Sequence, residues 1–330
     1  MQLSKSEKCI FLAILDWGLG HASRCVSLIQ QWEKEDKTVF VICSSSTIVF
    51  LKEECPSTQY LIAPAYNIRY PSASMALNMA WQGVRIFQTI FKEQQQLKKW
   101  VDEYQPDLIV SDGRFGCHHT SVKSIWLAHQ LQIQHAFKPL ANVLNYFYHQ
   151  FIKKNYQEVW IPDFEGSRSL AGHLSLPVKN IVHQYLGALS RFSSEKIVKT
   201  PIKYQYLVLL SGPEPQRTYL ESELLALLEQ KNVPSLLVRG VTNDSVLVSK
   251  SAQVKIINCL YGDDLFEHIM AAEKLICRSG YSTLMDLYYW KKPALLIPTP
   301  GQTEQIYLAK YWAKKGWCEW QEQGGIEVLC

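Results

Sequence analysis

Two stretches of the sequence combine residue types that can do chemistry on a polar substrate. The first runs from Asp16 through Gly18 and Gly20 to His21 and Arg24, directly after an apolar run. The glycines permit a tight turn and close approach of a ligand to the backbone. A histidine aimed from such a turn can accept a proton from an attacking hydroxyl near neutral pH. We predict that His21 is a catalytic base and that Gly18, Gly20 and Arg24 contact the acceptor that carries the hydroxyl. A loop histidine without a catalytic role is the alternative.

The second stretch, residues 277–309, contains two successive strand-loop-helix units. Apolar residues 274–277 predict a short buried strand, Ser279-Gly280 a tight turn and Ser282–Tyr289 a helix. The first N–H groups of a helix have no partner within it and can bind an anion. The second unit ends in a helix that carries Glu304 and Gln305. Because open α/β sheets bind ligands at the carboxyl ends of their strands, we predict a nucleotide-sugar pocket here.

Further polar residues extend this predicted pocket. Ser211-Gly212 follows the apolar run 207–210, and Arg217 comes soon after, so these residues could face a phosphate. Asp286 lies one helical turn after Thr283 and can accept hydrogen bonds from both hydroxyls of a ribose. Two structural alternatives stay open. Arg217 would be a solvated arginine after a Pro-rich loop, and Asp286 an acidic residue that stabilises a helix start.

A third group of polar residues, Ser111-Asp112-Gly113-Arg114, follows the apolar run 108–110. Asp112 is a second candidate for the catalytic base, and we expect Arg114 to contact the acceptor. An aspartate before glycine at the end of a strand is also a common turn residue, and that alternative stays open for Asp112.

Several other chemistries are disfavoured. A dinucleotide fingerprint needs a third glycine where this chain has Ser23, so NAD binding is not expected. His118 and His119 are adjacent but lack a third residue at metal-ligand spacing. No Asp-x-Asp sequence occurs. We therefore predict neither a metal site nor a cofactor.

The elements that must position these residues alternate between strand and helix along the chain. This alternation predicts two doubly wound parallel sheets of Rossmann type that face each other across a cleft. The predicted strands are Cys9–Leu15, Val39–Cys43, Tyr60–Ala63, Leu108–Val110, His135–Phe137, Glu158–Ile161, Tyr206–Leu210, Ser235–Val238, Val254–Ile257, Leu275–Cys277, Ala294–Ile297 and Trp317–Trp320.

The length of 330 residues and the hydrophobic share of 47% suffice for two cores. A polar, Ser/Lys-rich segment separates the two series of strands. We predict an N-terminal acceptor domain at 1–190, a linker at 191–204 and a C-terminal donor domain at 205–330.

Charge and cysteine content indicate which partners and which cellular compartment to expect. The net charge is only +4, from 34 basic and 30 acidic residues, which gives no field for binding nucleic acid. The nine cysteines show no Cys-x-x-Cys pairing, and residues 1–8 are polar and unlike a signal peptide, so we expect a reducing cytoplasm. No apolar stretch reaches the roughly 18 to 20 residues of a membrane span.

Residues 81–104 alternate apolar and basic or amide side chains and predict an amphipathic helix. The preferred interpretation is that Trp81, Val84, Phe87, Ile90, Phe91 and Trp100 pack against their own sheet. A face that lies on a membrane surface is the alternative, so peripheral contact at the inner face of the membrane stays open.

The segment from Arg278 to Asp286 resembles the Arg-Ser-Gly-x-x-Thr-x-x-Glu segment of glycosyltransferase family 28, a family of GT-B glycosyltransferases. Asp286 stands where the family has its ribose-binding glutamate, and Glu304-Gln305 where it has a Gln-Gln pair at the donor sugar. The glutamate at 304 departs from that pattern and leaves the sugar open. The glycine loop before His21 resembles a shortened form of the family's first loop. The family usually ends in a helix that crosses back to the first domain, and we do not expect that helix before Cys330.

The resemblance implies transfer of a hexose or N-acetylhexosamine from a UDP-sugar to an acceptor hydroxyl without a metal. It places Ser211, Gly212, Arg217, Arg278, Ser279, Gly280, Ser282 and Thr283 near the donor phosphates, Asp286 at the ribose, and Glu304 and Gln305 at the sugar. A lipid-linked or cell-surface glycan is the implied acceptor. Two alternatives stay open: a nucleotide-sugar hydrolase of the same fold, in which His21 activates water, and a binding protein without catalytic activity.

Overall fold

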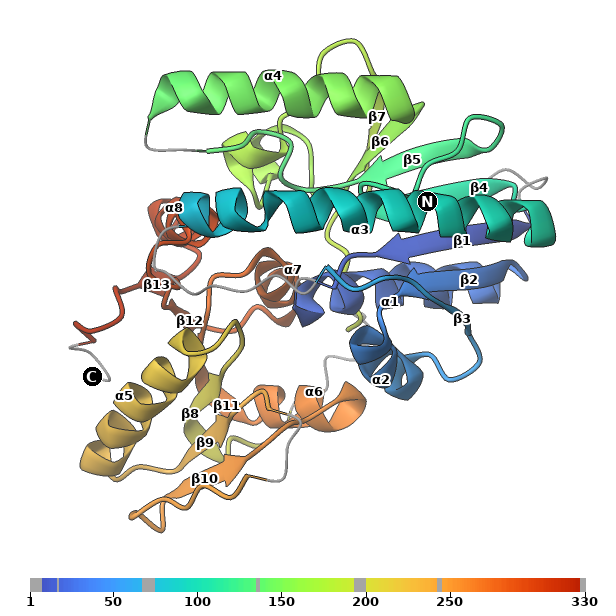
Figure 1. Ribbon diagram of the computed structural model, residues 1–330. Helices are drawn as coiled ribbons and strands as arrows, with labels where there is room; N and C mark the ends of the chain where they lie inside the picture. The colour runs from blue at the N-terminus through green and yellow to red at the C-terminus, as the bar shows by residue number, and fades with distance from the viewer. Residues whose placement is uncertain are drawn as a thin grey trace. The chain divides into compact units, whose positions relative to one another are not determined.

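In the computed structural model the chain folds into two α/β units, each built on a parallel sheet (Figure 1). The structure describes residues 8–16, 18–66, 75–134, 137–192, 200–241 and 245–326, without the side chains of 75–81. The first unit runs to Arg191, apart from residues 70–75, and the second begins at Phe192. Residues 193–199 of the predicted linker lie outside the described part. The predicted fold class, two Rossmann-like parallel-sheet domains, is confirmed.

The first sheet has the strand order β3-β2-β1-β4-β5-β6-β7, and every described pairing is parallel. The chain moves outward in one direction from β1 and in the other from β4, so the loops after these two neighbours diverge at their carboxyl ends. This edge carries His21 and Asp112. The strands are β1 (Cys9–Ile14), β2 (Thr38–Cys43), β3 (Gln59–Ile62), β4 (Leu108–Asp112), β5 (Lys123–Leu127), β6 (Glu158–Ile161) and β7 (Val182–Tyr185).

Four helices cover this sheet: α1 (Leu19–Lys34), α2 (Ser45–Glu54), α3 (Met75–Tyr104) and α4 (Lys138–Asn155). Parallel strands are joined by right-handed crossovers, which places α1 and α2 on one face of the sheet and α3 and α4 on the other. Figure 1 shows α3 and α4 on a common side of the unit. The inner stripe of α1, from Ala22 to Trp32, is buried and fixes the helix that carries His21.

The second sheet repeats this plan with the order β10-β9-β8-β11-β12-β13. Its switch point lies between β8 and β11, and the loops of the predicted pocket follow β8, β11 and β12. Its elements are β8 (Tyr204–Leu209), α5 (Gln216–Lys231), β9 (Ser235–Val238), β10 (Val254–Ile257), α6 (Gly262–Met270), β11 (Ala272–Cys277), α7 (Tyr281–Trp290), β12 (Ala294–Leu296), α8 (Thr303–Lys314) and β13 (Glu319–Trp320).

Two strands of the first sheet were not predicted. β5 begins with Lys123 and Ser124, so its apolar run is only three residues long; Ser124 is buried because its hydroxyl donates to the Val122 carbonyl. β7 is mostly exposed and has no apolar run. Conversely, the strand predicted at 135–137 is not observed. Phe137 precedes α4, and residues 135 and 136 lie outside the described part.

Helix α3 is longer than predicted and only half of it packs as expected. In its C-terminal half, Leu97 and Val101 are buried against β1, β2 and β4. Further towards its N-terminus, Val84, Phe87 and Phe91 are exposed, Phe87 by 74%. The prediction that these three side chains pack on the sheet was wrong, because the helix turns them to the surface. The side chain of Trp81 is outside the described part.

A buried ion pair between Glu93 and Arg114 joins α3 to the loop after β4. Both side chains are fully buried, and the guanidinium also donates to the Ile14 carbonyl at 2.7 Å. Glu93 accepts further hydrogen bonds from the Tyr66 hydroxyl (2.9 Å) and the Gly116 N–H (2.8 Å). The pair therefore fixes the loops after β1, β3 and β4. Arg114 has no exposed surface, so the predicted contact between its side chain and an acceptor does not fit the structure.

We expect Glu93→Gln to destabilise the first unit, because it leaves the buried Arg114 charge without its anionic partner. Loss of one member of a buried pair costs about 3 to 5 kcal/mol. Chemical denaturation followed by circular dichroism measures the change. The control is Glu103→Gln, the same substitution at an exposed position of α3. Equal stability of the two variants would show that the pair does not fix these loops.

Candidate functional site

His21 and Asp112 form a pair at the carboxyl edge of the first sheet. His21 lies in the first turn of α1, which starts after Gly18 at a φ of 79°, and Asp112 is the last residue of β4. His21 Nδ1 is 3.0 Å from Asp112 Oδ1. The carboxylate is fully buried, whereas the histidine side chain is 22% exposed. The structure thus brings the two candidates for the catalytic base together and exposes only one of them.

The ionised state of Asp112 follows from its partners. Arg24 binds both carboxylate oxygens, with Nε 2.9 Å from Oδ2, and the Cys25 thiol donates to Oδ2 at 3.2 Å. Burial by itself raises the pKa of Asp112, but the Arg24 guanidinium and the His21 ring outweigh it and hold the pKa well below its usual range. Asp112 is therefore a carboxylate at every ordinary pH.

This geometry divides the work between the two residues. A carboxylate at Nδ1 favours the tautomer in which Nδ1 donates and Nε2 holds the lone pair. None of the described residues binds Nε2, so this atom can accept a proton from a substrate. Asp112 has no exposed surface from which to reach a substrate; it orients the ring and stabilises the imidazolium that forms.

In the second unit, the start of α7 lacks a side-chain cap among the described residues. Gly280 precedes the helix, and its first turn contains no acidic residue. Ser282 and Thr283 in that turn are partly exposed. The exposed Ser211-Gly212 turn follows β8, which is hydrogen-bonded to β11, the strand before α7. These groups follow neighbouring strands, and a backbone surface of this kind can bind a phosphate.

Thr299, which was not predicted, adds a hydroxyl to this surface. It is 2% exposed, and its Oγ1 has no hydrogen-bond partner among the described residues. A Cβ added to Gly212 would lie 3.9 Å from that oxygen, so the loops after β8 and β12 adjoin. A buried hydroxyl without a partner is unfavourable unless a ligand or water satisfies it. The position of Thr299 in a Pro-Thr-Pro-Gly loop directly after β12 was the available signal in the sequence.

Three predicted phosphate ligands bind other protein groups instead. Arg217 is buried and pairs with Glu214 and Glu221. Arg278 is 1% exposed and donates to the carbonyls of residues 216, 297 and 298. The Ser279 hydroxyl donates to the Gln305 carbonyl at 2.8 Å. These side chains shape the loops around α7, and a phosphate contact by them does not fit the structure.

The predicted sugar and ribose ligands lie on α7 and α8. Gln305 Oε1 accepts the Thr299 N–H at 2.9 Å, and its Nε2 donates to Gln302 at 2.7 Å, so this side chain holds the loop after β12. Glu304 is partly exposed in the first turn of α8. Asp286 is 8% exposed and lies on the buried side of α7, one turn beyond Thr283.

His129 lies next to Arg24 and, like Thr299, was not predicted from the sequence. Its Nδ1 lies 2.9 Å from a terminal nitrogen of Arg24, on the side away from Asp112. Because β5 itself was not predicted, nothing in the sequence placed the residue after it at the same edge as His21.

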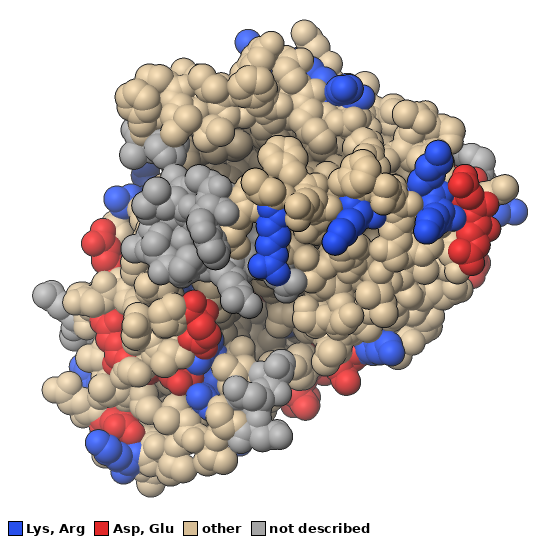
Figure 2. Space-filling model, viewed as in Figure 1, with Lys and Arg blue, Asp and Glu red and all other residues tan. Residues whose placement is uncertain are grey.

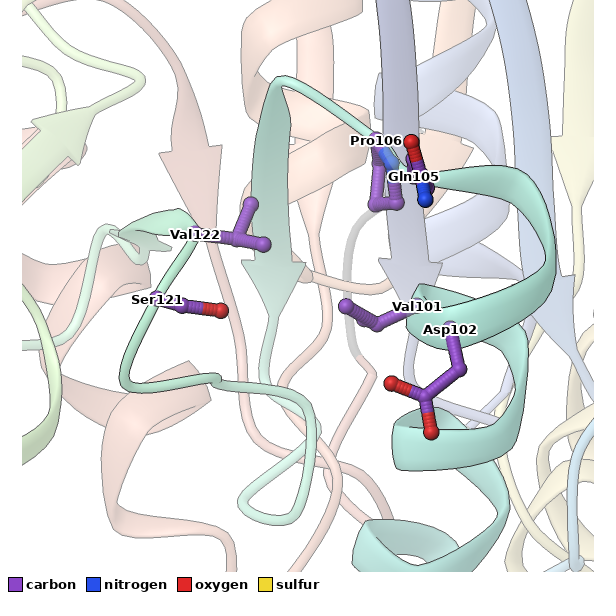
Figure 3. A pocket seen from close by; sticks show the side chains of 6 residues that line it. All are labelled: Val101, Asp102, Gln105, Pro106, Ser121 and Val122. Carbon is purple, nitrogen blue, oxygen red and sulfur yellow. The ribbon is translucent and has the colours of Figure 1, made fainter.

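Neither a metal cluster nor a membrane span is found among the described residues: no three His, Cys, Asp or Glu side chains could hold an ion together, and no helix is long and apolar enough to cross a bilayer. One surface pocket is lined by Val101, Asp102, Gln105, Pro106, Ser121 and Val122 (Figure 3). It lies near the amino ends of β4 and β5, away from His21 and Asp112.

The Asp112 pair has a defined pH dependence of stability. Folding lowers the pKa of the Asp112 carboxyl. The ionised carboxylate therefore stabilises the fold above the pKa of an unfolded aspartate, about 4, and this stabilisation is lost as the pH falls towards the lower pKa of the folded protein. We expect Asp112→Asn to destabilise the protein by about 3 kcal/mol at pH 7, since the buried Arg24 loses its anionic partner. Denaturation of both proteins between pH 7 and pH 3 should show the difference shrinking below about pH 4. A difference that stays constant would contradict an ionised Asp112.

Comparison with known proteins points to glycosyltransferases. Residues 220–327 match the glycosyltransferase family 28 C-terminal domain. The UDP-N-acetylglucosamine--N-acetylmuramyl-(pentapeptide) pyrophosphoryl-undecaprenol N-acetylglucosamine transferase of Rickettsia felis is 26% identical over 204 residues, which are 56% of this chain and 55% of that protein. The chain thus spans about half the length of this relative.

Solved structures resemble the whole chain in fold. The glycosyltransferase of kitacinnamycin superposes with a TM-score of 0.69 at 12% identity, over 98% of this chain and 88% of that one. MurG of Acinetobacter baumannii gives 0.58 at 13% identity, over 97% and 86%. Residues 220–327 therefore carry a glycosyltransferase family 28 C-terminal domain, in a chain with the two-domain fold of the GT-B glycosyltransferases.

Proposed function

We propose that the protein transfers a hexose or N-acetylhexosamine from a nucleotide sugar to an acceptor hydroxyl. The observation that carries this proposal is the pair of His21 and the buried Asp112, with Nε2 of the histidine bound by none of the residues that the structure describes. Nε2 takes the proton of the acceptor hydroxyl while the hydroxyl oxygen attacks C1 of the sugar. The bond from C1 to the diphosphate oxygen breaks, and the diphosphate departs with the electron pair.

The second unit binds the donor in this proposal. The departing diphosphate lies at the first turn of α7, where the N–H groups stabilise its growing negative charge without a divalent cation. Ser211, Gly212, Ser282 and Thr283 are its further contacts, together with the buried hydroxyl of Thr299. We propose Asp286 for the ribose and Glu304 for the sugar. The UDP-linked donor named for the Rickettsia felis relative favours UDP as the nucleotide.

We expect His21→Ala to lower turnover by about 100-fold or more while UDP affinity stays nearly unchanged, since the proton acceptor is lost and the donor site is intact.

Asp286→Ala should weaken UDP binding by about tenfold, the value of one charge-assisted hydrogen bond. Calorimetry with UDP and a radiolabelled-sugar transfer assay measure the two quantities. Equal loss of both in His21→Ala would contradict its role as the base.

A hydrolase of the same fold would use His21 in the same way, with water as the acceptor. The histidine is partly exposed, which leaves room for either nucleophile. Release of free sugar from UDP-sugar without any acceptor separates the two activities. A release rate unchanged by an acceptor panel would favour hydrolysis, and donor binding without turnover would favour a binding protein.

We further propose that α3 and α4 contact the cytoplasmic face of a membrane, where a lipid-linked acceptor would be presented. On α4 and the residue before it, Phe137, Leu140, Val143, Tyr146 and Phe147 are exposed, as are Val84, Phe87 and Phe91 on α3. Helix α4 contains no acidic residue, and Glu93, the acidic residue of α3 between 84 and 101, is buried. Figure 2 shows basic side chains along α3 and acidic ones only towards its C-terminal end.

Exposed aromatic residues among basic ones fit an interface with anionic lipid, which holds rings at headgroup depth and attracts lysine and arginine. We expect Phe87→Asp with Phe147→Asp to reduce cosedimentation with phosphatidylglycerol vesicles by more than tenfold. The control is Val246→Asp with Val248→Asp, at residues that are exposed by 87% and 76% in the second unit. Equal sedimentation of both variants would rule out docking by these helices.

A further inference from the structure

We propose that Arg24 is a positioning residue that compensates the charge of Asp112 and so sets how readily the His21 ring accepts the proton of the acceptor hydroxyl. This inference rests on the proposed role of His21 as the base. Arg24 itself is 3% exposed and acts through Asp112, so it does not need to touch a substrate.

All three nitrogens of the Arg24 guanidinium contact a neighbouring side chain. Its Nε and one terminal nitrogen bind the two oxygens of Asp112, and the other terminal nitrogen is bound to His129. A planar guanidinium fixes a carboxylate at two points, whereas a lysine would fix it at one. The same terminal nitrogen that binds Oδ1 of Asp112 lies 3.0 Å from Nδ1 of His21. The ring of His21 is thus next to a full positive and a full negative charge.

The two charges act on His21 in opposite directions. A carboxylate at hydrogen-bond distance favours the imidazolium, and a guanidinium at the same distance disfavours it. With Asp112 alone, the ring would be next to an uncompensated negative charge, which favours its protonated form. With Arg24 present, the pair is close to neutral overall, and Asp112 can still orient the ring.

The other titratable groups around the pair come from several elements. Cys25 lies beside Asp112 on α1, Cys43 ends β2, and His129 follows β5. Burial raises the pKa of the Cys43 thiol and of the Tyr148 hydroxyl on α4 to about 12 each, so both are neutral. The pKa of the Cys25 thiol is raised still further above its usual value, mainly by burial. Asp16, in the loop after β1, is paired with Arg114.

The test is the titration of the His21 ring signals by NMR, assigned by their loss in His21→Gln. We expect the midpoint to move up by about one pH unit in Arg24→Met and to move down in Asp112→Asn. Arg24→Lys keeps the charge and should leave the midpoint near that of the wild type. The double variant Arg24→Met/Asp112→Asn removes both buried charges, is expected to fold, and should also titrate near the wild type.

Midpoints that do not move in opposite directions in the two single variants would overturn the proposal. If neither single variant folds, a double variant whose midpoint departs from the wild type by a full pH unit would overturn it as well. The readout needs no substrate, so it stands apart from the proposed function. Opposite shifts in a protein without transfer activity would support the role of Arg24 and contradict the glycosyltransferase assignment.

Discussion

The buried carboxylate of Asp112 is the constraint on which the first unit depends. A full negative charge at the inner end of a strand must be compensated, because transfer of an ion from water to a protein interior is unfavourable by several kcal/mol. Arg24 and His21 meet this need from the first turns of α1. The need to neutralise Asp112 therefore also sets the position and orientation of His21, the proposed catalytic base.

Three other buried arginines also have partners within the protein. Arg114, Arg217 and Arg278 are all buried, and each binds carboxylates or carbonyls of its own unit. Basic side chains near a diphosphate site are easily taken for phosphate ligands. Here they hold the loops, and in the proposed donor site the positive potential for a phosphate would come from the backbone at the start of α7. This division suits a donor site that must release its product, because backbone N–H groups bind a diphosphate without a buried countercharge.

Sequence reasoning reached the fold because most strands are apolar runs bounded by turn residues, as in β1, β2 and β9. It missed β5, whose apolar run is short, and β7, an exposed strand at the edge of the sheet, because neither shows this pattern. It found His21 and Asp112 separately, since each follows a strand, but not that they are bonded across 91 residues. It assigned Arg114 to a substrate because its pairing with Glu93, on the preceding helix α3, cannot be read from spacing.

A crystal structure with a bound nucleotide sugar tests the account most directly. We expect the diphosphate oxygens to accept hydrogen bonds from the N–H groups of the first turn of α7 and from the Thr299 hydroxyl. A diphosphate held by the side chain of Arg217 or Arg278, or a nucleotide bound in the first unit, would contradict it.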